Sequence, residues 1–332
     1  MKILVTGASG FIGGRFARFA LEQGFDVRVS GRRAEGVEHL VRRGAEFIPG
    51  DLTDGLLVRD LCVDVDAVVH CAGHTGAWGR YQDFHRDNVL VTENVVEACL
   101  KQRVRRLVHL SSASLYFDGR SHTDLTEDQL PRRFRHPYAA TKNLAEQKVF
   151  GAQEFGLEVI ALRPRFVTGA GDMSLFPRLL KLQRKGRLAI VGNGLNKVDF
   201  TSIQNLNEAL MSSLLTTGSA VGKAYNISNG TPIPLWDVIN YVMRQMNVPQ
   251  VTRYRGYGLA YSLGALSEAA CKMWPGQPEP TLSRLGVQIM DKDFTLDISR
   301  ARHYLDYDPK VSLWAALDEF CGWWKAQESP YR

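Results

Sequence analysis

Two residues four positions apart, Tyr138 and Lys142, have the types and spacing needed to move a proton. On a helix, residues with this spacing lie on one face. The phenol of tyrosine has an ordinary pKa of about 10, which is too high for an efficient base at neutral pH. A nearby ammonium favours the phenolate, and an oxidised nicotinamide would add to that effect. We therefore expect Tyr138 to take a proton from an alcohol or to give one to a developing alkoxide.

A tyrosine and a lysine with this spacing also occur on ordinary helix surfaces, so the prediction depends on the segments that precede them. The run from His109 to Tyr116 ends a predicted strand and contains three serines. Ligands of open parallel sheets bind outside the carboxyl ends of the strands. Ser112 is expected there, where its hydroxyl would hold the substrate oxygen. Ser111 and Ser114 are the alternatives.

A glycine-rich turn follows the first predicted strand. The glycines of Gly7-Ala8-Ser9-Gly10-Phe11-Ile12-Gly13 let the chain turn tightly and bring backbone N–H groups close to a pyrophosphate. The helix that follows offers its positive end to that anion. The alternative is a tight turn without a ligand. The residues expected to hold a dinucleotide here are Gly7, Ser9, Gly10, Phe11, Ile12 and Gly13.

The end of the second predicted strand bears on the choice of cofactor. NAD-preferring sites place Asp or Glu there to accept a hydrogen bond from the ribose 2′-hydroxyl. This chain has Gly31, followed by Arg32 and Arg33. An arginine fork fits a phosphate with two hydrogen bonds. We therefore predict a preference for NADP(H), the alternative being that both arginines face solvent and either cofactor is accepted.

Two further strand ends complete the predicted cofactor site. After the third strand, Asp51 either accepts a hydrogen bond from the adenine amino group, with Leu52 against the ring, or caps the next helix. After the fourth strand, the small residues Cys71, Ala72 and Gly73 would let a cofactor lie across the sheet edge.

The elements that position these residues follow a βαβ rhythm. Apolar runs with little polar alternation are typical of a parallel sheet covered on both faces. The predicted strands are 3–6, 27–30, 46–49, 67–70, 107–111 and 159–163, and a late strand at 224–227 rejoins the sheet. The predicted helices include 11–23, 88–101, 139–155 and 177–185.

These patterns predict an α/β fold with a doubly wound, mostly parallel Rossmann sheet and a smaller, mainly helical C-terminal domain. Residues 1–167, with a returning segment near 198–230, form the predicted dinucleotide-binding domain. Residues 168–332 form the predicted substrate domain, which is discontinuous.

Composition narrows the class of protein. The net charge of +6 comes mostly from scattered arginine pairs such as Arg105-Arg106, which are expected to be solvated and do not indicate nucleic-acid binding. Five cysteines without CxxC spacing favour reduced thiols and a cytoplasmic location, and no cluster suggests a metal. No signal peptide is expected at the N-terminus. The apolar stretch 258–274 is either a buried or partly exposed helix or one that contacts lipid beside an apolar substrate entrance.

Taken together, Gly7 to Gly13, Ser112, Tyr138 and Lys142 resemble the extended short-chain dehydrogenases, which place Ser, Tyr and Lys in these roles. Further segments resemble the 3β-hydroxysteroid dehydrogenase-like branch, and most closely bacterial 2-alkyl-3-ketoalkanoic acid reductases. The segments that carry this resemblance are 76–79, 88–89, 162–165, 198–201 and 225–230. The resemblance covers nearly the whole chain.

The resemblance carries further implications. Asp51 and Leu52 would flank adenine, and Cys71, Ala72 and Gly73 would line the cofactor channel. Pro164 would abut the nicotinamide carboxamide, and Asn88 would order the site or only bridge strands. The resemblance also implies NADPH as cofactor, with Arg32 matching a basic residue, and a homodimer formed through helices 88–101 and 139–155. Phe117, where relatives often have glycine, would reshape the substrate pocket.

The expected reaction interconverts a secondary alcohol and a ketone on a bulky apolar substrate, either a 3-keto acid or a 3β-hydroxysteroid. Aromatic residues in segments near the cleft favour an apolar ligand, although core packing explains each of them as well. Those residues are Trp78, Tyr81, Tyr116, Phe166, Phe176 and Phe200. Arg165 would pair with a substrate carboxylate or with an internal acid. The alternatives are a nucleotide-sugar epimerase or dehydratase and a non-enzymatic NADP-binding protein.

Overall fold

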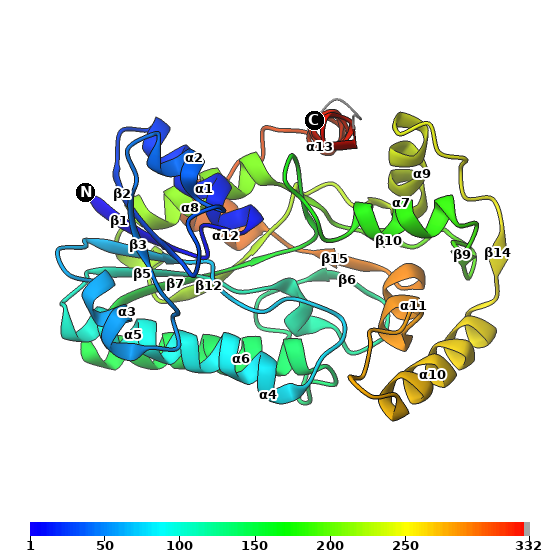
Figure 1. Ribbon diagram of the computed structural model, residues 1–332, viewed down its shortest axis with the longest axis horizontal. Helices are drawn as coiled ribbons and strands as arrows, with labels where there is room; N and C mark the ends of the chain where they lie inside the picture. The colour runs from blue at the N-terminus through cyan, green and yellow to red at the C-terminus, as the bar shows by residue number, and fades with distance from the viewer. Residues whose placement is uncertain (329–332) are drawn as a thin grey trace.

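The computed structural model describes residues 1–328. Its centre is a seven-stranded sheet in which every pair of neighbouring strands is parallel (Figure 1). Across the sheet, the strands are β12 (Lys223–Ile227), β7 (Glu158–Pro164), β5 (Arg106–Leu110), β4 (Ala67–His70), β1 (Lys2–Thr6), β2 (Asp26–Gly31) and β3 (Glu46–Pro49). This order reverses at β1, as in dinucleotide-binding folds. The predicted fold class is confirmed.

Helices cover both faces of this sheet (Figure 1). One layer holds α1 (Phe11–Glu22), α2 (Glu38–Val41), α8 (Ile203–Leu215) and α12 (Ser299–Leu305). The other layer holds α3 (Gly55–Leu61), α4 (Tyr81–His85), the π-helical turn η1 (Arg86–Leu90), α5 (Val91–Lys101) and α6 (Pro137–Gly151). A separate buried apolar cluster fills each layer, which explains why the strands carry little polar alternation.

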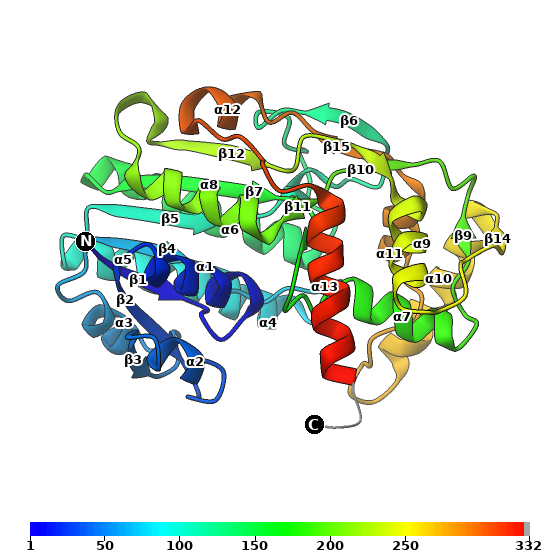
Figure 2. The same ribbon diagram turned by 90° about the horizontal axis from the view of Figure 1, so that it is seen from above.

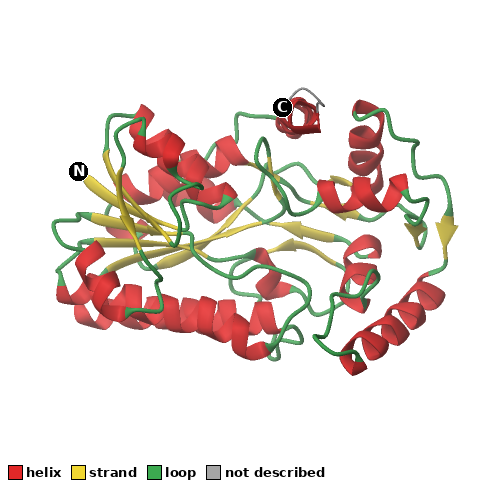
Figure 3. Ribbon diagram, in the orientation of Figure 1, coloured by secondary structure: helices red, strands yellow, loops and turns green. Residues whose placement is uncertain are grey.

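The second part of the molecule is mainly helical and carries short strands (Figure 3). Its helices are α7 (Phe176–Arg184), α9 (Leu235–Gln245), α10 (Tyr257–Met273), α11 (Arg284–Asp291) and α13 (Leu313–Glu328). Figure 2 shows α13 running between the large sheet and the helices α7 and α9. Within residues 1–328, three short 3₁₀ turns lie outside these helices, η2 (Ala113–Tyr116), η3 (Ala152–Phe155) and η4 (Gly218–Ala220).

Short strands connect the two parts. A four-stranded sheet has the order β13 (Ile233–Pro234), β10 (Lys197–Val198), β15 (Phe294–Leu296) and β6 (His122–Leu125). Two strand pairs complete the set, β8 (Val167–Thr168) with β11 (Thr201–Ser202) and β9 (Ile190–Val191) with β14 (Tyr254–Arg255). The sequence analysis missed β6, because its residues HTDL have no apolar run. The division of the chain near residue 167 stays a prediction.

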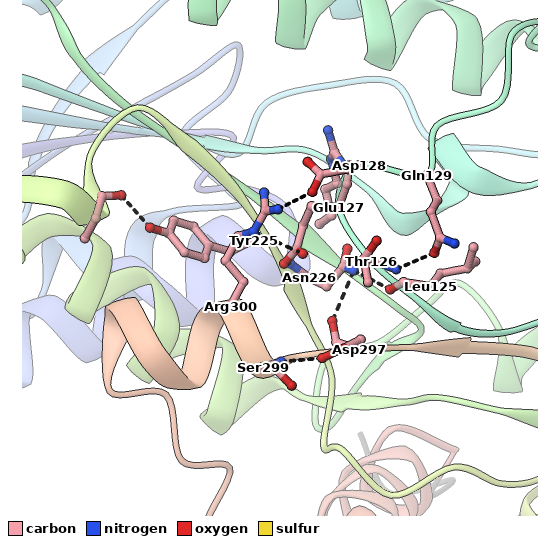
Figure 4. A network of polar contacts seen from close by, with 12 residues as sticks. Leu125, Thr126, Glu127, Asp128, Gln129, Tyr225, Asn226, Asp297, Ser299 and Arg300 are labelled. Carbon is pink, nitrogen blue, oxygen red and sulfur yellow. Dashed lines mark hydrogen bonds and ion pairs between the residues drawn. The ribbon is translucent and has the colours of Figure 1, made fainter.

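A polar network fastens β12 to this second sheet (Figure 4). Glu127 accepts a hydrogen bond from the backbone N–H of Asn226 at 2.8 Å, and the Asn226 amide donates to the carbonyl oxygens of Leu125 and Asp297. Arg300 of α12 forms ion pairs with Glu127 and Asp128. Asn226 therefore connects β12 to the end of β6 and to the segment that follows β15.

One expectation about charge is wrong. Arg106 is fully buried, although the arginine pairs were expected to be solvated. Its guanidinium pairs with Glu158 and donates to the carbonyl oxygens of Ser213, Leu214 and Thr216. Those carbonyls end α8 without helical partners, so a buried arginine satisfies them.

Candidate active site

The start of α6 positions Tyr138 and Lys142. His136 caps the helix by accepting the Tyr138 N–H on Nδ1 at 3.2 Å, and Pro137 occupies the first turn, where its missing N–H is harmless. The other ring nitrogen of His136 donates to the Ala77 carbonyl at 2.8 Å, which fixes its tautomer. Tyr138 is half-buried and lines a cavity, while Lys142 is buried. The phenol therefore borders a space that a ligand can enter.

The three candidate serines have different surroundings. Ser111 donates a hydrogen bond to Glu146 at 2.5 Å inside the protein. Ser112 follows the end of β5, accepts the Ser114 N–H at 3.1 Å and contacts the Tyr138 phenol. Ser114 lines the cavity. The structure thus places Ser112 next to Tyr138, whereas the Ser111 hydroxyl is used in a buried hydrogen bond to Glu146.

Lys142 does not bond to Tyr138. Its ammonium donates to the Leu110 carbonyl at 2.6 Å and to His109 Nε2 at 3.2 Å. Burial lowers the pKa of Lys142 to about 8, opposed by Glu146 and Cys71. Burial raises the pKa of Tyr138, and its contact with Ser112 opposes the rise. In this structure the Lys142 ammonium is therefore held by strand β5 and not by the phenol, and its effect on the acidity of Tyr138 stays a prediction.

Two buried histidines, which the sequence analysis did not single out, lie beside Lys142. The His70 and His109 rings are 5.4 Å apart, and burial lowers the pKa of both, that of His70 to about 3. His70 accepts from Thr6 at 2.7 Å and donates to Thr92 at 3.0 Å, since the Thr92 hydroxyl itself donates to a carbonyl. Both imidazoles stay neutral. In the sequence, only their position at the ends of neighbouring predicted strands could have indicated that these two histidines lie near the site.

Asn88 joins the loop after β4 to α6. Its Oδ1 accepts the His74 N–H at 2.7 Å, and its Nδ2 donates to the His74 carbonyl and to Thr141 at 3.1 Å each. Thr141 lies one residue before Lys142 on α6. Asn88 therefore holds the loop against the helix that carries Tyr138, rather than bridging two strands.

The glycine turn leaves no room for side chains. Gly7 has φ +68°, and a β-carbon there would lie 2.7 Å from the Ala72 nitrogen. A β-carbon at Gly13 would lie 2.5 Å from the Gly7 carbonyl oxygen. Helix α1 begins after Gly10 without a side-chain cap, so its first N–H groups remain available to an anion. Ser9 and Gly10 are exposed, and Phe11 and Ile12 half-buried, at this cradle, which fits a dinucleotide pyrophosphate.

Arg32 and Arg33 follow β2 and are exposed. A β-carbon at the preceding Gly31 would lie 3.8 Å from Ser9 Oγ, so both arginines start beside the glycine turn. Across residues 1–328, neither arginine has a hydrogen bond or ion pair within the protein, although Arg32 is close enough to lower the pKa of Asp51.

Asp51 is not a helix cap. Its carboxylate accepts the Thr53 N–H and hydroxyl at 2.9 Å each, hydrogen bonds that lower its pKa, and Asp54 caps α3 instead. The capping alternative is wrong, and the carboxylate of Asp51 stays exposed beside half-buried Leu52.

The remaining predicted cofactor residues lie at the ends of β4 and β7. Cys71 and Ala72 pack against Gly7, and burial raises the pKa of the Cys71 thiol to about 12, which keeps it neutral. Gly73 is exposed, and a β-carbon there would lie 2.9 Å from Asn88 Oδ1. Pro164 is buried and ends β7.

A cavity of about 910 Å³ opens beside Tyr138. Its wall is largely apolar, with leucines and other aliphatic side chains from α7, α10 and α11, such as Leu179, Leu182, Ala260 and Met290. Phe117 also lines it, as predicted. Of the six aromatic residues expected at the cleft, Phe166 lines the cavity. Tyr116, Phe176 and Phe200 are buried in the core, and Trp78 and Tyr81 lie outside the cavity wall.

Comparisons with known proteins agree with this geometry. Residues 3–228 match the model of a family described as the NAD dependent epimerase/dehydratase family. The chain is 38% identical over 322 residues to the 2-alkyl-3-oxoalkanoate reductase of Stenotrophomonas maltophilia, which covers 94% of this chain and 96% of that protein. It is 30% identical over 327 residues to the human sterol-4-alpha-carboxylate 3-dehydrogenase, decarboxylating, covering 96% of this chain and 86% of that protein.

A solved structure shares the same fold. The UDP-glucuronic acid 4-epimerase from Bacillus cereus, solved in complex with NAD, superposes with a TM-score of 0.78 at 25% identity. The match covers 99% of this chain and 100% of that one.

Proposed function

Because this chain belongs to the NAD dependent epimerase/dehydratase family, we propose that it is an NADP(H)-dependent oxidoreductase that interconverts a ketone and a secondary alcohol. The substrate is bulky and apolar, of the 3-keto acid or 3β-hydroxysteroid kind. The observation that carries the proposal is that the Tyr138 phenol, in contact with Ser112, borders a largely apolar cavity of about 910 Å³.

Tyr138, Ser112 and Lys142 have separate roles in the proposed reduction. Burial raises the pKa of Tyr138, so at neutral pH its phenol is protonated and can donate to the developing alkoxide. Ser112 holds the same oxygen, and the Lys142 ammonium, one helical turn farther along α6, would stabilise the phenolate that remains. The dinucleotide, when bound, supplies the hydride to the carbonyl carbon. A solvent proton then restores the phenol, so one hydride and one proton are added per ketone.

The experiment follows NADPH consumption with a 3-keto acid, a 3-ketosteroid and a UDP-sugar, for wild type and Tyr138→Phe. We expect net loss of NADPH with a ketone and a fall of about 10²- to 10⁴-fold in kcat for the variant, since it lacks the proton donor. Ser111→Ala and Ser112→Ala are matched variants of neighbouring serines, and only Ser112→Ala removes a hydroxyl that the proposed mechanism uses. Retained turnover in Tyr138→Phe would overturn the proposal, and dinucleotide binding without turnover would indicate a binding protein.

The preference for NADP(H) is also proposed, on the two arginines at the end of β2. The exposed guanidinium groups of Arg32 and Arg33 lie beside the glycine turn and have no protein partner in residues 1–328. They are therefore free to bind a 2′-phosphate. We expect Arg32→Ala to weaken NADPH binding by about tenfold, or 1.4 kcal/mol, and NADH binding much less. Equal weakening of both would contradict a phosphate contact.

One observation favours a second function, nucleotide-sugar epimerisation or dehydration. Five arginines also line the cavity, where they could meet a diphosphate, namely Arg165, Arg178, Arg187, Arg253 and Arg255. Arg178 is already paired with Glu279, and most of the cavity wall is apolar. Conversion of the UDP-sugar without net loss of cofactor would favour this function over the first.

Helix α10 is proposed to touch a lipid surface. In the structure as described, no helix is long and apolar enough to cross a membrane. The apolar side chains of Leu259, Leu263, Leu266 and Met273 are exposed along α10, and Trp274 is exposed directly after it. Ala260 of the same helix lines the cavity. An apolar substrate could thus enter from a bilayer. Co-sedimentation with vesicles should fall when Leu259 and Leu266 are both replaced by Ser.

A homodimer through α5 and α6 is the last part of the proposal. It rests on the family resemblance of these helices, which pack side by side in one layer (Figure 1). Sedimentation equilibrium measures the mass directly, and a monomer at micromolar concentration would contradict the proposed dimer.

A further inference from the structure

The loop of residues 75–79, which follows β4, forms part of the cavity wall. Residues 75–77 of this loop line the same cavity as Tyr138. Gly76 and Gly79 have φ +153° and +150°, conformations that residues with a β-carbon rarely adopt. Loops that close over a substrate change conformation at a few positions of this kind. The two glycines therefore give the 75–79 loop two places at which its backbone can turn.

Hydrogen bonds hold two neighbouring residues in the middle of this loop. The carbonyl oxygen of Ala77 accepts a hydrogen bond from His136 Nε2 at 2.8 Å. Trp78 Nε1 donates to the carbonyl oxygen of Gln277 at 2.9 Å, in the segment between α10 and α11. The loop is thus tied on one side to the start of α6, which carries Tyr138, and on the other side to the segment before α11.

The imidazole of His136 also holds the backbone of Tyr138. Its Nδ1 accepts the Tyr138 N–H at 3.2 Å, while its Nε2 donates to Ala77. Both bonds require a neutral ring, because an imidazolium has no nitrogen left to accept. Burial lowers the pKa of His136, with the Ala77 hydrogen bond and Glu268 opposing, so the ring is neutral at neutral pH. One side chain therefore links the loop to Tyr138.

A buried aromatic ring makes a second link between the same groups. Phe84 is fully buried, and its ring centre lies 6.1 Å from that of His136 and 6.3 Å from that of Tyr138. A β-carbon at Gly79 would lie 2.9 Å from the Phe84 ring, so the end of the loop packs directly on it. In a close-packed interior, one such ring cannot move without displacing its neighbours. A change in the loop therefore reaches the phenol through His136 and Phe84.

Helix capping alone does not explain why residue 136 is a histidine. The residues preferred at this position are Ser, Thr, Asp and Asn, and Asp54, Ser202 and Ser283 cap α3, α8 and α11 of this chain. Such a side chain would satisfy the helix, but it ends near the position of Nδ1 and would not reach Ala77. Only a longer side chain with an acceptor and a donor on opposite sides bonds to both.

We propose that His136 is a positioning residue that couples the 75–79 loop to Tyr138, so that closure of the loop over a ketone places the phenol against the ketone oxygen. This inference rests on the proposed function, since it adds a residue to the same reaction. His136 transfers no proton, because the backbone uses both of its ring nitrogens. Loss of this link should therefore lower kcat, whereas loss of the Trp78 bond on the other side of the loop should raise KM for the ketone.

Two substitutions separate the two hydrogen bonds of His136. In His136→Asn the side-chain oxygen replaces Nδ1 and keeps the helix cap, but no atom reaches Ala77. In His136→Gln the side-chain NH₂ replaces Nε2 and keeps the bond to Ala77, but the cap is lost. We expect each variant to lower kcat for ketone reduction by about 10- to 100-fold, since a small misplacement of a reacting group is enough for such a loss. His136→Asn should keep the Tm of wild type, whereas His136→Gln should lower it by about 2–4 °C.

Trp78→Phe removes the donor to Gln277 and leaves both bonds of His136. It should raise KM for the ketone by about fivefold, the effect of one hydrogen bond, and keep kcat within about twofold. The control is His303→Asn, an exposed histidine on α12, which should keep both parameters within about twofold of wild type. Unchanged kcat in His136→Asn would overturn the proposal. A fall in kcat matched by equal losses in NADPH affinity and Tm would also overturn it, because it indicates a structural role alone.

Fluorine NMR of the NADPH complex gives a readout without turnover. The chain has six tryptophans, and in protein labelled with 5-fluorotryptophan the Trp78 signal is the one missing from Trp78→Phe. His136→Asn should shift or split this signal, and His136→Gln should leave it as in wild type. That pattern in a protein that reduces no ketone would contradict the proposed function and support the link to the loop. Ketone reduction with an unchanged signal in His136→Asn would contradict the link and support the proposed function.

Discussion

Two buried arginines, two residues apart at the end of β7, have opposite surroundings. Arg163 forms an ion pair with Glu146 and donates to the Tyr116 hydroxyl at 2.6 Å and to the Glu127 carbonyl at 2.8 Å. Arg165 lies between two aromatic rings and has no such partners in the described chain. The contrast teaches that burial alone does not make a charge part of the scaffold, since only the first of these two buried arginines is tied to other segments by its hydrogen bonds.

The Glu146 carboxylate explains why the first arginine belongs to the scaffold. Glu146 lies on α6, one helical turn after Lys142, and accepts hydrogen bonds from Arg163 and from Ser111. The pair therefore ties β7 and the end of β5 to the helix that carries Tyr138. Ser112 follows Ser111 directly, so this network also sets the position of the candidate catalytic serine.

The largest effect that we expect is on the stability of the scaffold. Arg163→Met should lower the free energy of unfolding by about 3–5 kcal/mol, because it leaves Glu146 buried without its counter-ion. Denaturant titration of the protein without substrate measures this change. The double variant with Glu146→Leu removes both charges and should be less destabilised than the sum of the two single variants. Additive losses would show that the two side chains do not act as a pair.

The second arginine should behave differently in the same measurement. Arg165→Met removes a buried cation that has no protein partner and loses only its ring contacts, which are worth up to about 2 kcal/mol. We expect the free energy of unfolding to stay within about 1 kcal/mol of wild type or to rise, since replacing a buried charge by an apolar side chain is often neutral or stabilising. A loss as large as that of Arg163→Met would remove the distinction between the two arginines.

The same contrast shows how far the sequence could go. It predicted the strands of the large sheet and the glycine turn, and it singled out Ser112, Tyr138 and Lys142, because apolar runs and short spacings report local structure and the order of a βαβ fold. It could not tell Arg163 from Arg165, since the hydrogen-bond partners that distinguish Arg163 lie 17 to 47 positions away in the chain. It also placed Tyr116, Phe176 and Phe200 at the cleft, although the core of the second part encloses them.

The hydrogen bonds of Lys142 were beyond the sequence for a similar reason. The sequence predicted that Lys142 faces Tyr138, as helical spacing requires. It gave no sign that the Leu110 carbonyl and His109 would take the ammonium, because those groups belong to a neighbouring strand. The same holds for Asp51, whose carboxylate turns to Thr53 instead of capping α3.

The smallest expected effect is a loss of reduction at alkaline pH. Burial lowers the pKa of Lys142 to about 8, so its ammonium is charged below that pH and the charge is lost as the pH rises through it. Because the proposed mechanism uses this charge to stabilise the phenolate, kcat/KM for reduction should fall above pH 8. Stopped assays of the reduction from pH 6 to 10 measure this fall. A rate that stays constant from pH 7 to 10 would show that reduction does not depend on the charge of Lys142.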